Sequence, residues 1–180
     1  MKFLLGTFLF SMSSCSSLLY ETPAPKKEQV LYKEIKDKHW KYESSIDSMS
    51  GKKSYSAMNL SLNNVSIDYP IKGKTQCGFG ITKSDDDSPQ AILAVNYGII
   101  NFVEGRWIRI KFDENQPEQF QIRELGNGKG GMVALETYPY ERFWEKLHNA
   151  KKMQVELLIY GDGLKEFNFD VINLQTFFTN

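Results

Sequence analysis

Histidine and cysteine, the residues that most often hold transition metals or act as bases and nucleophiles, are scarce in this chain. His39 and His148 stand far apart, and neither lies at ligand spacing from another histidine or from a cysteine. A zinc site usually needs three or four such ligands. The chain also lacks a G-x-S-x-G nucleophile motif and a clear serine, histidine and aspartate order. The sequence therefore predicts neither a zinc site nor a Ser–His or Cys–His enzyme.

Two short motifs carry residue types that could bind a ligand. Residues 126–131 (GNGKGG) match G-x-G-x-x-G, but residues 132–136 after them read as a strand, where a dinucleotide-binding motif opens a helix. Residues 84–89 hold three successive aspartates, which could bind Ca²⁺, yet they lack the spacing, glycine and final glutamate of an EF-hand loop. We expect a hairpin loop and a solvated turn, so no cofactor or metal is predicted.

Carboxylates near strand ends give one further route to catalysis. Asp113, Glu136 and Asp170 could approach one another in space and share acid–base work. Asp113 and Asp170 follow phenylalanines at strand ends, where side chains that cap turns are common. We expect the structural role and predict that the protein is not an enzyme. A carboxylate- or metal-dependent hydrolase is the alternative.

The segment 106–113 has the clearest strand pattern. Ile108, Ile110 and Phe112 share one face, and Trp107, Arg109 and Lys111 lie on the other. Because tryptophan and arginine are enriched in binding hot spots, the second set is a candidate contact surface. The alternative is ordinary cross-strand pairing on a solvated face.

The remaining pattern indicates a mainly β protein. Strands are predicted at 57–62, 76–82, 91–97, 119–123, 132–137, 153–160 and 166–171, the last two forming a hairpin across the turn 161–163. One helix is predicted at 140–150 from apolar residues at helical spacing. We expect β-sandwich-like antiparallel sheets with this single helix, in the C-terminal half, packed on the sheet.

The N-terminal residues are typical of an export signal. A basic start at Lys2 precedes an apolar run at 3–10 and small residues before Cys15. The run is far shorter than the roughly 20 residues that span a bilayer. Residues 15–37 are polar and proline-containing, with little to bury. We predict a signal peptide at 1–14, a flexible tether at 15–37 and a single β-rich domain at 38–180.

Residues 12–15 (MSSC) resemble the lipobox of bacterial lipoproteins. The resemblance implies that Cys15 becomes the first mature residue and carries acyl chains such as palmitate, and two or more chains give stable membrane anchoring. Ser16 follows the cysteine in place of aspartate, which by the same resemblance favours the outer membrane, with the domain facing the periplasm.

The charge balance bears on the class of binding partner, and the cysteine count bears on the state of Cys77. The 22 basic and 22 acidic residues balance, whereas a nucleic-acid binder shows a concentrated basic surface. We therefore expect no nucleic-acid partner. If Cys15 carries lipid, Cys77 has no cysteine to pair with, and we expect it to be a buried thiol.

Several short pieces taken together resemble a group of uncharacterised exported bacterial proteins and, more distantly, periplasmic proteins of the invasion-associated locus B type. These pieces are Trp40–Tyr42, Asp47–Lys52, Arg109–Asp113 with Pro117, Phe143 with Leu147 and Ala150–Met153, and Phe167–Val171 with Leu174. The resemblance implies a β-sandwich-like envelope domain and no catalytic residues. It also implies a cysteine pair in the central hairpin, for which Cys77 has no partner here.

These observations lead to one main hypothesis of function. We expect a lipid-anchored envelope protein whose non-catalytic β-rich domain binds a protein or another envelope component. The alternatives are the hydrolase described above and a periplasmic immunity or inhibitor protein.

Overall fold

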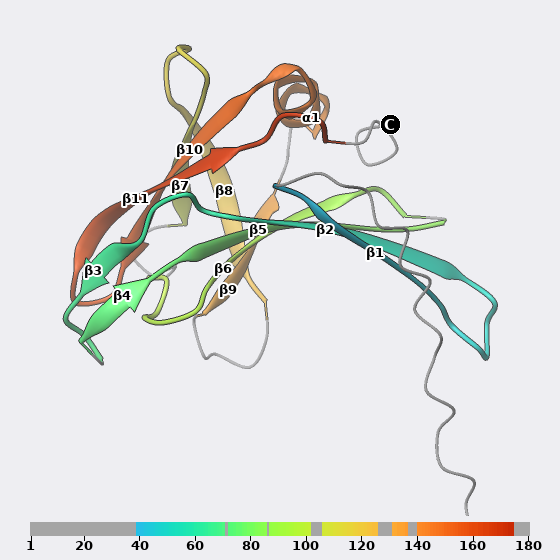
Figure 1. Cartoon of the computed structure of the whole chain (residues 1–180), viewed down its shortest axis with the longest axis horizontal. Coiled ribbons are helices and arrows are strands. Elements are labelled where there is room, and N and C mark those ends of the chain that lie inside the picture. Colours follow the sequence, from blue (N-terminus) through green and yellow to red (C-terminus); the bar gives the residue numbers. More distant parts are fainter. Residues whose placement is uncertain are drawn as a thin grey trace, which may run out of the picture.

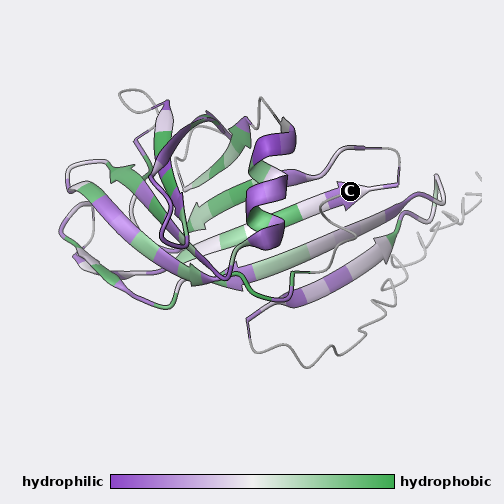
Figure 2. Ribbon diagram, turned by 90° about the horizontal axis from the view of Figure 1, so that it is seen from above, coloured by the Kyte–Doolittle hydropathy of each residue, from purple (hydrophilic) through white to green (hydrophobic). Residues whose placement is uncertain are grey.

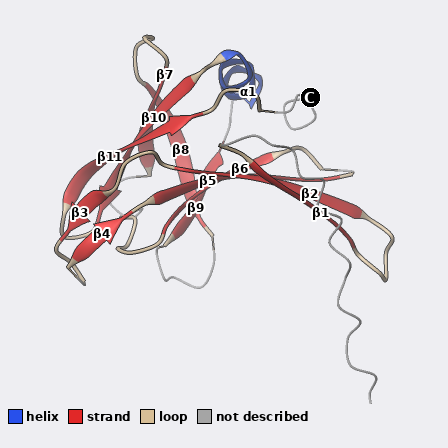
Figure 3. Cartoon of the chain, in the orientation of Figure 1, coloured by secondary structure: helices blue, strands red, loops and turns tan. Residues whose placement is uncertain are grey.

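The computed structural model describes residues 39–70, 72–85, 87–101, 106–125, 131–136 and 140–174. The predicted signal peptide and tether, with Cys15, lie outside these ranges. Strands dominate the described residues, and the one helix among them lies in the C-terminal half (Figure 3). The elements are β1 (Lys41–Ile46), β2 (Lys53–Leu60), β3 (Val65–Ile67), β4 (Gly73–Thr75), β5 (Cys77–Ser84), β6 (Gln90–Val95), β7 (Trp107–Phe112), β8 (Glu118–Glu124), β9 (Met132–Glu136), α1 (Tyr140–Asn149), β10 (Lys152–Ile159) and β11 (Gly163–Asp170).

Nine of these strands form one antiparallel sheet in the order β1-β2-β5-β6-β9-β8-β7-β10-β11, and β3 pairs with β4 in a small second sheet. The large sheet bends, so that β7, β10 and β11 cross over β2, β5 and β6 (Figure 1). Phe79 on β5 and Phe169 on β11 meet across the core with ring centroids 6.0 Å apart. The predicted mainly β class is confirmed, with both halves of the sandwich-like core supplied by one sheet.

Helix α1 covers the core beside β7 and β8. Phe143 is fully buried and packs edge-on against Phe112 of β7 and Phe120 of β8, with centroids 5.8 and 5.4 Å away. Leu147 follows one turn later and is also buried, whereas Glu141 is exposed. The helix crosses strands whose hydrophilic and hydrophobic positions alternate (Figure 2). The predicted helix is thus confirmed, because its apolar stripe at helical spacing has a sheet to cover.

Alternation along β7 and along the β10–β11 hairpin predicts the buried faces correctly. Ile108, Ile110 and Phe112 are all no more than 3% exposed. The hairpin register runs from Lys152 opposite Asp170 to Ile159 opposite Gly163. The predicted hairpin across residues 161–163 is thus confirmed, with Gly161 and Gly163 both at positive φ.

In β2 the strand prediction is right but the apolar residues face solvent. Met58 and Leu60 are each 45% exposed, while Ala57, Asn59 and Ser61 are buried. Asn59 and Ser61 can be buried because each forms a hydrogen bond within the chain. Asn59 Nδ2 donates to the Asp170 carbonyl oxygen at 2.6 Å, and the Ser61 hydroxyl donates to the Asn63 carbonyl oxygen at 2.8 Å.

The chain just after β2 covers the free edge of β11, chiefly through the side-chain amide of Asn63. Asn63 Nδ2 donates to the Glu166 carbonyl oxygen at 2.9 Å, and Asn63 Oδ1 accepts from the Asn168 backbone N–H at 2.8 Å. The Leu62 N–H donates to the Asn168 carbonyl oxygen at 2.7 Å. One side chain therefore replaces two hydrogen bonds of a missing strand, which protects an edge that could otherwise pair with another chain.

Candidate functional site

The predicted contact surface on β7 is outward-facing, but two of its three side chains have ionic partners. Trp107 is 56% exposed. Arg109 forms a two-pronged pair with Glu156 of β10, with Nε–Oε1 at 2.7 Å and Nη2–Oε2 at 2.5 Å. These hydrogen bonds to Glu156 raise the pKa of Arg109 above its ordinary value. Lys111 Nζ lies 3.7 Å from Glu114 Oε2. The two cations thus make the surface pairs expected of a solvated sheet, and Trp107 alone presents an exposed apolar side chain.

Strand register places amide side chains beside this surface. Gln121 of β8 is opposite Trp107, and Gln119 is opposite Arg109. On the other side, Lys111 is opposite Gln154 of β10, and Gln154 is opposite Asn168 of β11. The face therefore runs from an exposed aromatic ring, through an ion pair, to a row of amides.

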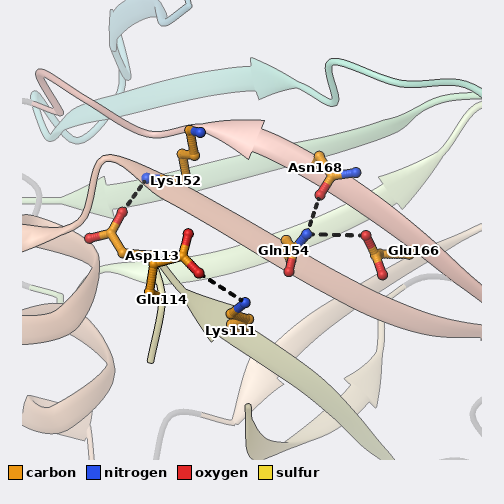
Figure 4. Close-up of polar contacts among 7 residues, drawn as sticks. All are labelled: Lys111, Asp113, Glu114, Lys152, Gln154, Glu166 and Asn168. Atoms are coloured by element: carbon orange, nitrogen blue, oxygen red, sulfur yellow. Dashed lines mark hydrogen bonds and ion pairs between the residues drawn. The ribbon is translucent and has the colours of Figure 1, made fainter. Parts of the chain in front are cut away.

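A trough of about 250 Å³ lies at the amide end of this face. It crosses β10 and β11, with Lys111 and Glu114 on one side (Figure 4). The exposed Leu62 also lines it, next to Asn168 of β11. Its lining consists of Leu62, Lys111, Asp113, Glu114, Lys152, Met153, Gln154, Asn168 and Phe169. Lys111 thus belongs both to the predicted contact surface and to the trough, whereas Trp107 and Arg109 do not line it.

The two amides in the trough orient each other. Gln154 Nε2 donates to Asn168 Oδ1 at 2.9 Å and to Glu166 Oε1 at 3.2 Å (Figure 4). Both side chains are partly buried. Nε2 of Gln154 and Oδ1 of Asn168 are engaged in hydrogen bonds within the protein. The Gln154 side-chain oxygen and the Asn168 side-chain nitrogen are therefore the groups that could bind a ligand.

Gln154, Asn168 and Leu62 were not predicted from the sequence as site residues. The hairpin turn at 161–163 held the signal for the first two, because counting back equally from it pairs residue 154 with residue 168. Leu62 could not be found this way. Its place beside β11 depends on the bend of the sheet.

Two of the three carboxylates considered for acid–base work, Asp113 and Asp170, cap turns, as expected. Asp113 accepts from the backbone N–H groups of Lys151 and Lys152, at 3.0 and 2.9 Å to Oδ1. Asp170 Oδ1 accepts from the Ile172 N–H at 3.2 Å, and its Oδ2 lies 3.4 Å from His39 Nε2. Both carboxylates thus hold the chain where it leaves a strand.

The two motif-bearing segments have the expected surroundings. The strand β9 begins directly after the glycine-rich stretch, of which residues 126–130 lie outside the described residues. In the aspartate-rich segment, Asp85 accepts from the Lys53 N–H at 3.2 Å, and the Asp87 N–H donates to the Ser84 carbonyl oxygen at 3.1 Å. A turn between β5 and β6 is confirmed. Within the described ranges no cluster of three or more His, Cys, Asp or Glu side chains is arranged to hold a metal ion.

Cys77 is a buried thiol, as predicted. It is 0% exposed, and burial raises its pKa to about 12. Its backbone N–H donates to the Ser61 hydroxyl oxygen at 3.1 Å. The residue is part of the core and is unsuited to nucleophilic chemistry at neutral pH.

Two larger hollows are open to solvent. One of about 580 Å³ lies over β1, β2 and β5 and is lined mainly by serines. The other, of about 600 Å³, borders α1 near Arg142 and Lys146, where Glu118 of β8 forms ion pairs with both side chains. Within the described ranges, helix α1 is far too short to span a bilayer, and no other helix is found there.

Comparison with known proteins gives little further information. No family model matches the chain, and no curated protein matches it. A solved structure, invasion associated protein B from Bartonella henselae, is similar at 13% sequence identity and a TM-score of 0.42. The match covers 75% of this chain and 87% of that one. The likeness is distant, so the lipoprotein class stays a prediction from the sequence.

Proposed function

We propose that this chain is a lipid-anchored protein of the bacterial envelope whose single β-rich domain is non-catalytic and binds a protein or another envelope component. The basic, apolar and small-residue order before Cys15 supports export and acylation. The balanced charge of the chain supports a partner other than nucleic acid. An outer-membrane position facing the periplasm is part of the proposal, on the ground that Ser16 follows the cysteine.

The observation that carries the binding role is the exposed ring of Trp107. A tryptophan that leaves 56% of its surface in water has a large apolar area still to bury. Arg109 beside it is fixed by Glu156 in a planar pair, so a partner that covers the ring meets a pre-oriented polar rim. Tryptophan in such a setting is the residue type most enriched in hot spots.

The binding role is tested by comparing two variants in affinity capture from envelope extract. Trp107→Ala should lose a partner that the natural chain retains, and Met49→Ala should keep it. Met49 is 96% exposed in the β1–β2 turn and is the matched apolar control. The captured partner is then purified, and its affinity for both variants is measured directly. Equal affinity for the natural chain and Trp107→Ala would refute this surface.

The anchor is tested separately. Cells that express the chain are labelled with palmitate, and the mature N-terminus is determined by mass spectrometry. The expected result is a chain that begins at an acylated Cys15, with no label in Cys15→Ser. An uncleaved N-terminus with an unmodified thiol would refute the anchor and leave the binding test unaffected.

A further inference from the structure

The trough across β10 and β11 has the features of a small-ligand site. Its volume of about 250 Å³ is slightly below the usual range for drug-sized ligands, so it suits a molecule of one ring. Figure 4 shows Lys111 and Glu114 on one side and the amides of Gln154 and Asn168 along the strands. The lining thus combines a defined volume with two amides that orient each other.

The charges of the lining favour a neutral ligand. Two lysines, Lys111 and Lys152, accompany two carboxylates, Asp113 and Glu114, so the formal charges cancel. The Asp113 carboxylate is occupied by backbone N–H groups, and the Lys111 ammonium lies beside Glu114. A simple cation would therefore meet carboxylates that already have partners, whereas a neutral polar molecule would leave both arrangements intact.

The two amides favour a ligand that carries both a hydrogen-bond donor and an acceptor. The oxygen of Gln154 can accept and the nitrogen of Asn168 can donate, since their other ends bond to protein. A secondary amide offers the complementary pair, an N–H and a C=O. Leu62, 62% exposed, supplies an apolar wall for a methyl group or the C–H face of a ring.

Together these features match a hexose that carries an acetamido group. Its hydroxyls suit the Lys111 and Glu114 side, its acetamido N–H and C=O suit the two amides, and its C–H face suits Leu62. We infer that the trough binds an N-acetylated amino sugar, alone or as the end of a saccharide chain. This inference goes beyond the proposed contact through Trp107, which does not line the trough, and names a saccharide as a further envelope component that the domain binds.

The test is a titration of the full-length, ¹⁵N-labelled chain with N-acetylglucosamine, observed by NMR. The side-chain NH₂ signals of Gln154 and Asn168 should shift saturably, and glucose, which lacks the acetamido group, should bind at least tenfold more weakly. Gln154→Ala and Asn168→Ala should each weaken binding at least tenfold. Gln121→Ala, an amide on the same sheet face outside the trough, should not change it.

Three outcomes would overturn the inference. They are no saturable shift, equal binding of glucose, and equal binding of an acetylated amino acid amide, which would assign the trough to peptides. The same experiments distinguish failure of the saccharide site from failure of the proposed binding role of Trp107. A chain that ignores the sugar but captures a partner through Trp107 refutes only the saccharide site, whereas a chain that does neither refutes both.

Discussion

Replacing Asn63 by alanine should destabilise the domain measurably, although the residue lies outside any regular element. Its amide satisfies the Glu166 carbonyl oxygen at 2.9 Å and the Asn168 N–H at 2.8 Å. The alanine variant loses both bonds at once. A hydrogen bond of this kind contributes about 0.5–1.5 kcal/mol net. Two such bonds together contribute about 1–3 kcal/mol. Because water can reach the partly exposed edge, we expect a loss in the lower part of that range, about 1–2 kcal/mol in the free energy of unfolding.

The assay is urea unfolding of the natural chain, Asn63→Ala and Asn64→Ala. Asn64 is the exposed neighbour of the same residue type, so its variant controls for the change of side chain in that loop. The urea midpoint should fall for Asn63→Ala at an unchanged m-value, which marks a pure stability change. The Asn168 amide should also exchange faster with deuterium. Equal midpoints for the two variants would refute the view that this side chain serves as a strand partner.

Three further predictions concern the turn after β10 and the core thiol. Gly161→Ala should destabilise more than Gly163→Ala in thermal melts. Both glycines have positive φ (78° and 74°), but only at Gly161 would a Cβ fall 3.0 Å from Tyr69, and a smaller effect than at Gly163 would refute this reasoning. Cys77 should resist a thiol reagent at about pH 8 in the folded protein and react on unfolding, because burial raises its pKa to about 12; rapid labelling of folded protein would contradict it. Backbone N–H donors, chiefly that of Asp68, lower the pKa of Asp162 from its ordinary value of 3.8. The ionised Asp162 side chain therefore stabilises the folded state above the ordinary pKa, and this stabilisation is lost as the pH falls through the lowered pKa. Asp162→Asn should therefore reduce the fall in stability below about pH 4, and an unchanged pH dependence would count against this role.

The elements with strong periodicity were predictable from the sequence. The segment 106–113 and the hairpin strands alternate cleanly because each has one face in the core and one in water. Alternation in β2 was equally clear but misleading about the buried face. Asn59 and Ser61 can face the core because the carbonyl oxygens of Asp170 and Asn63 accept their hydrogen bonds. Asn63 follows Ser61 closely, but Asp170 lies far along the chain on β11, so the sequence pattern of β2 gives no sign of it.

The candidate site was predictable only in part. Trp107, Arg109 and Lys111 were found because they share the outward face of one strand. The partner of Arg109 was not found, since Glu156 lies on β10, which pairs with β7 only through the order of the sheet. The trough needed four separate segments brought together, so no single stretch of sequence could indicate it.

The sequence alone determined the class of fold, the helix, the hairpin and the outward position of Trp107, because each depends on spacing within one segment. Tertiary structure decided which row of β2 is buried, how Asn63 completes the edge of β11, and where the trough lies. The physical reason is that hydrophobic periodicity is a local property of the chain. The pairing of distant polar groups is settled only when the sheet bends and brings its two ends together.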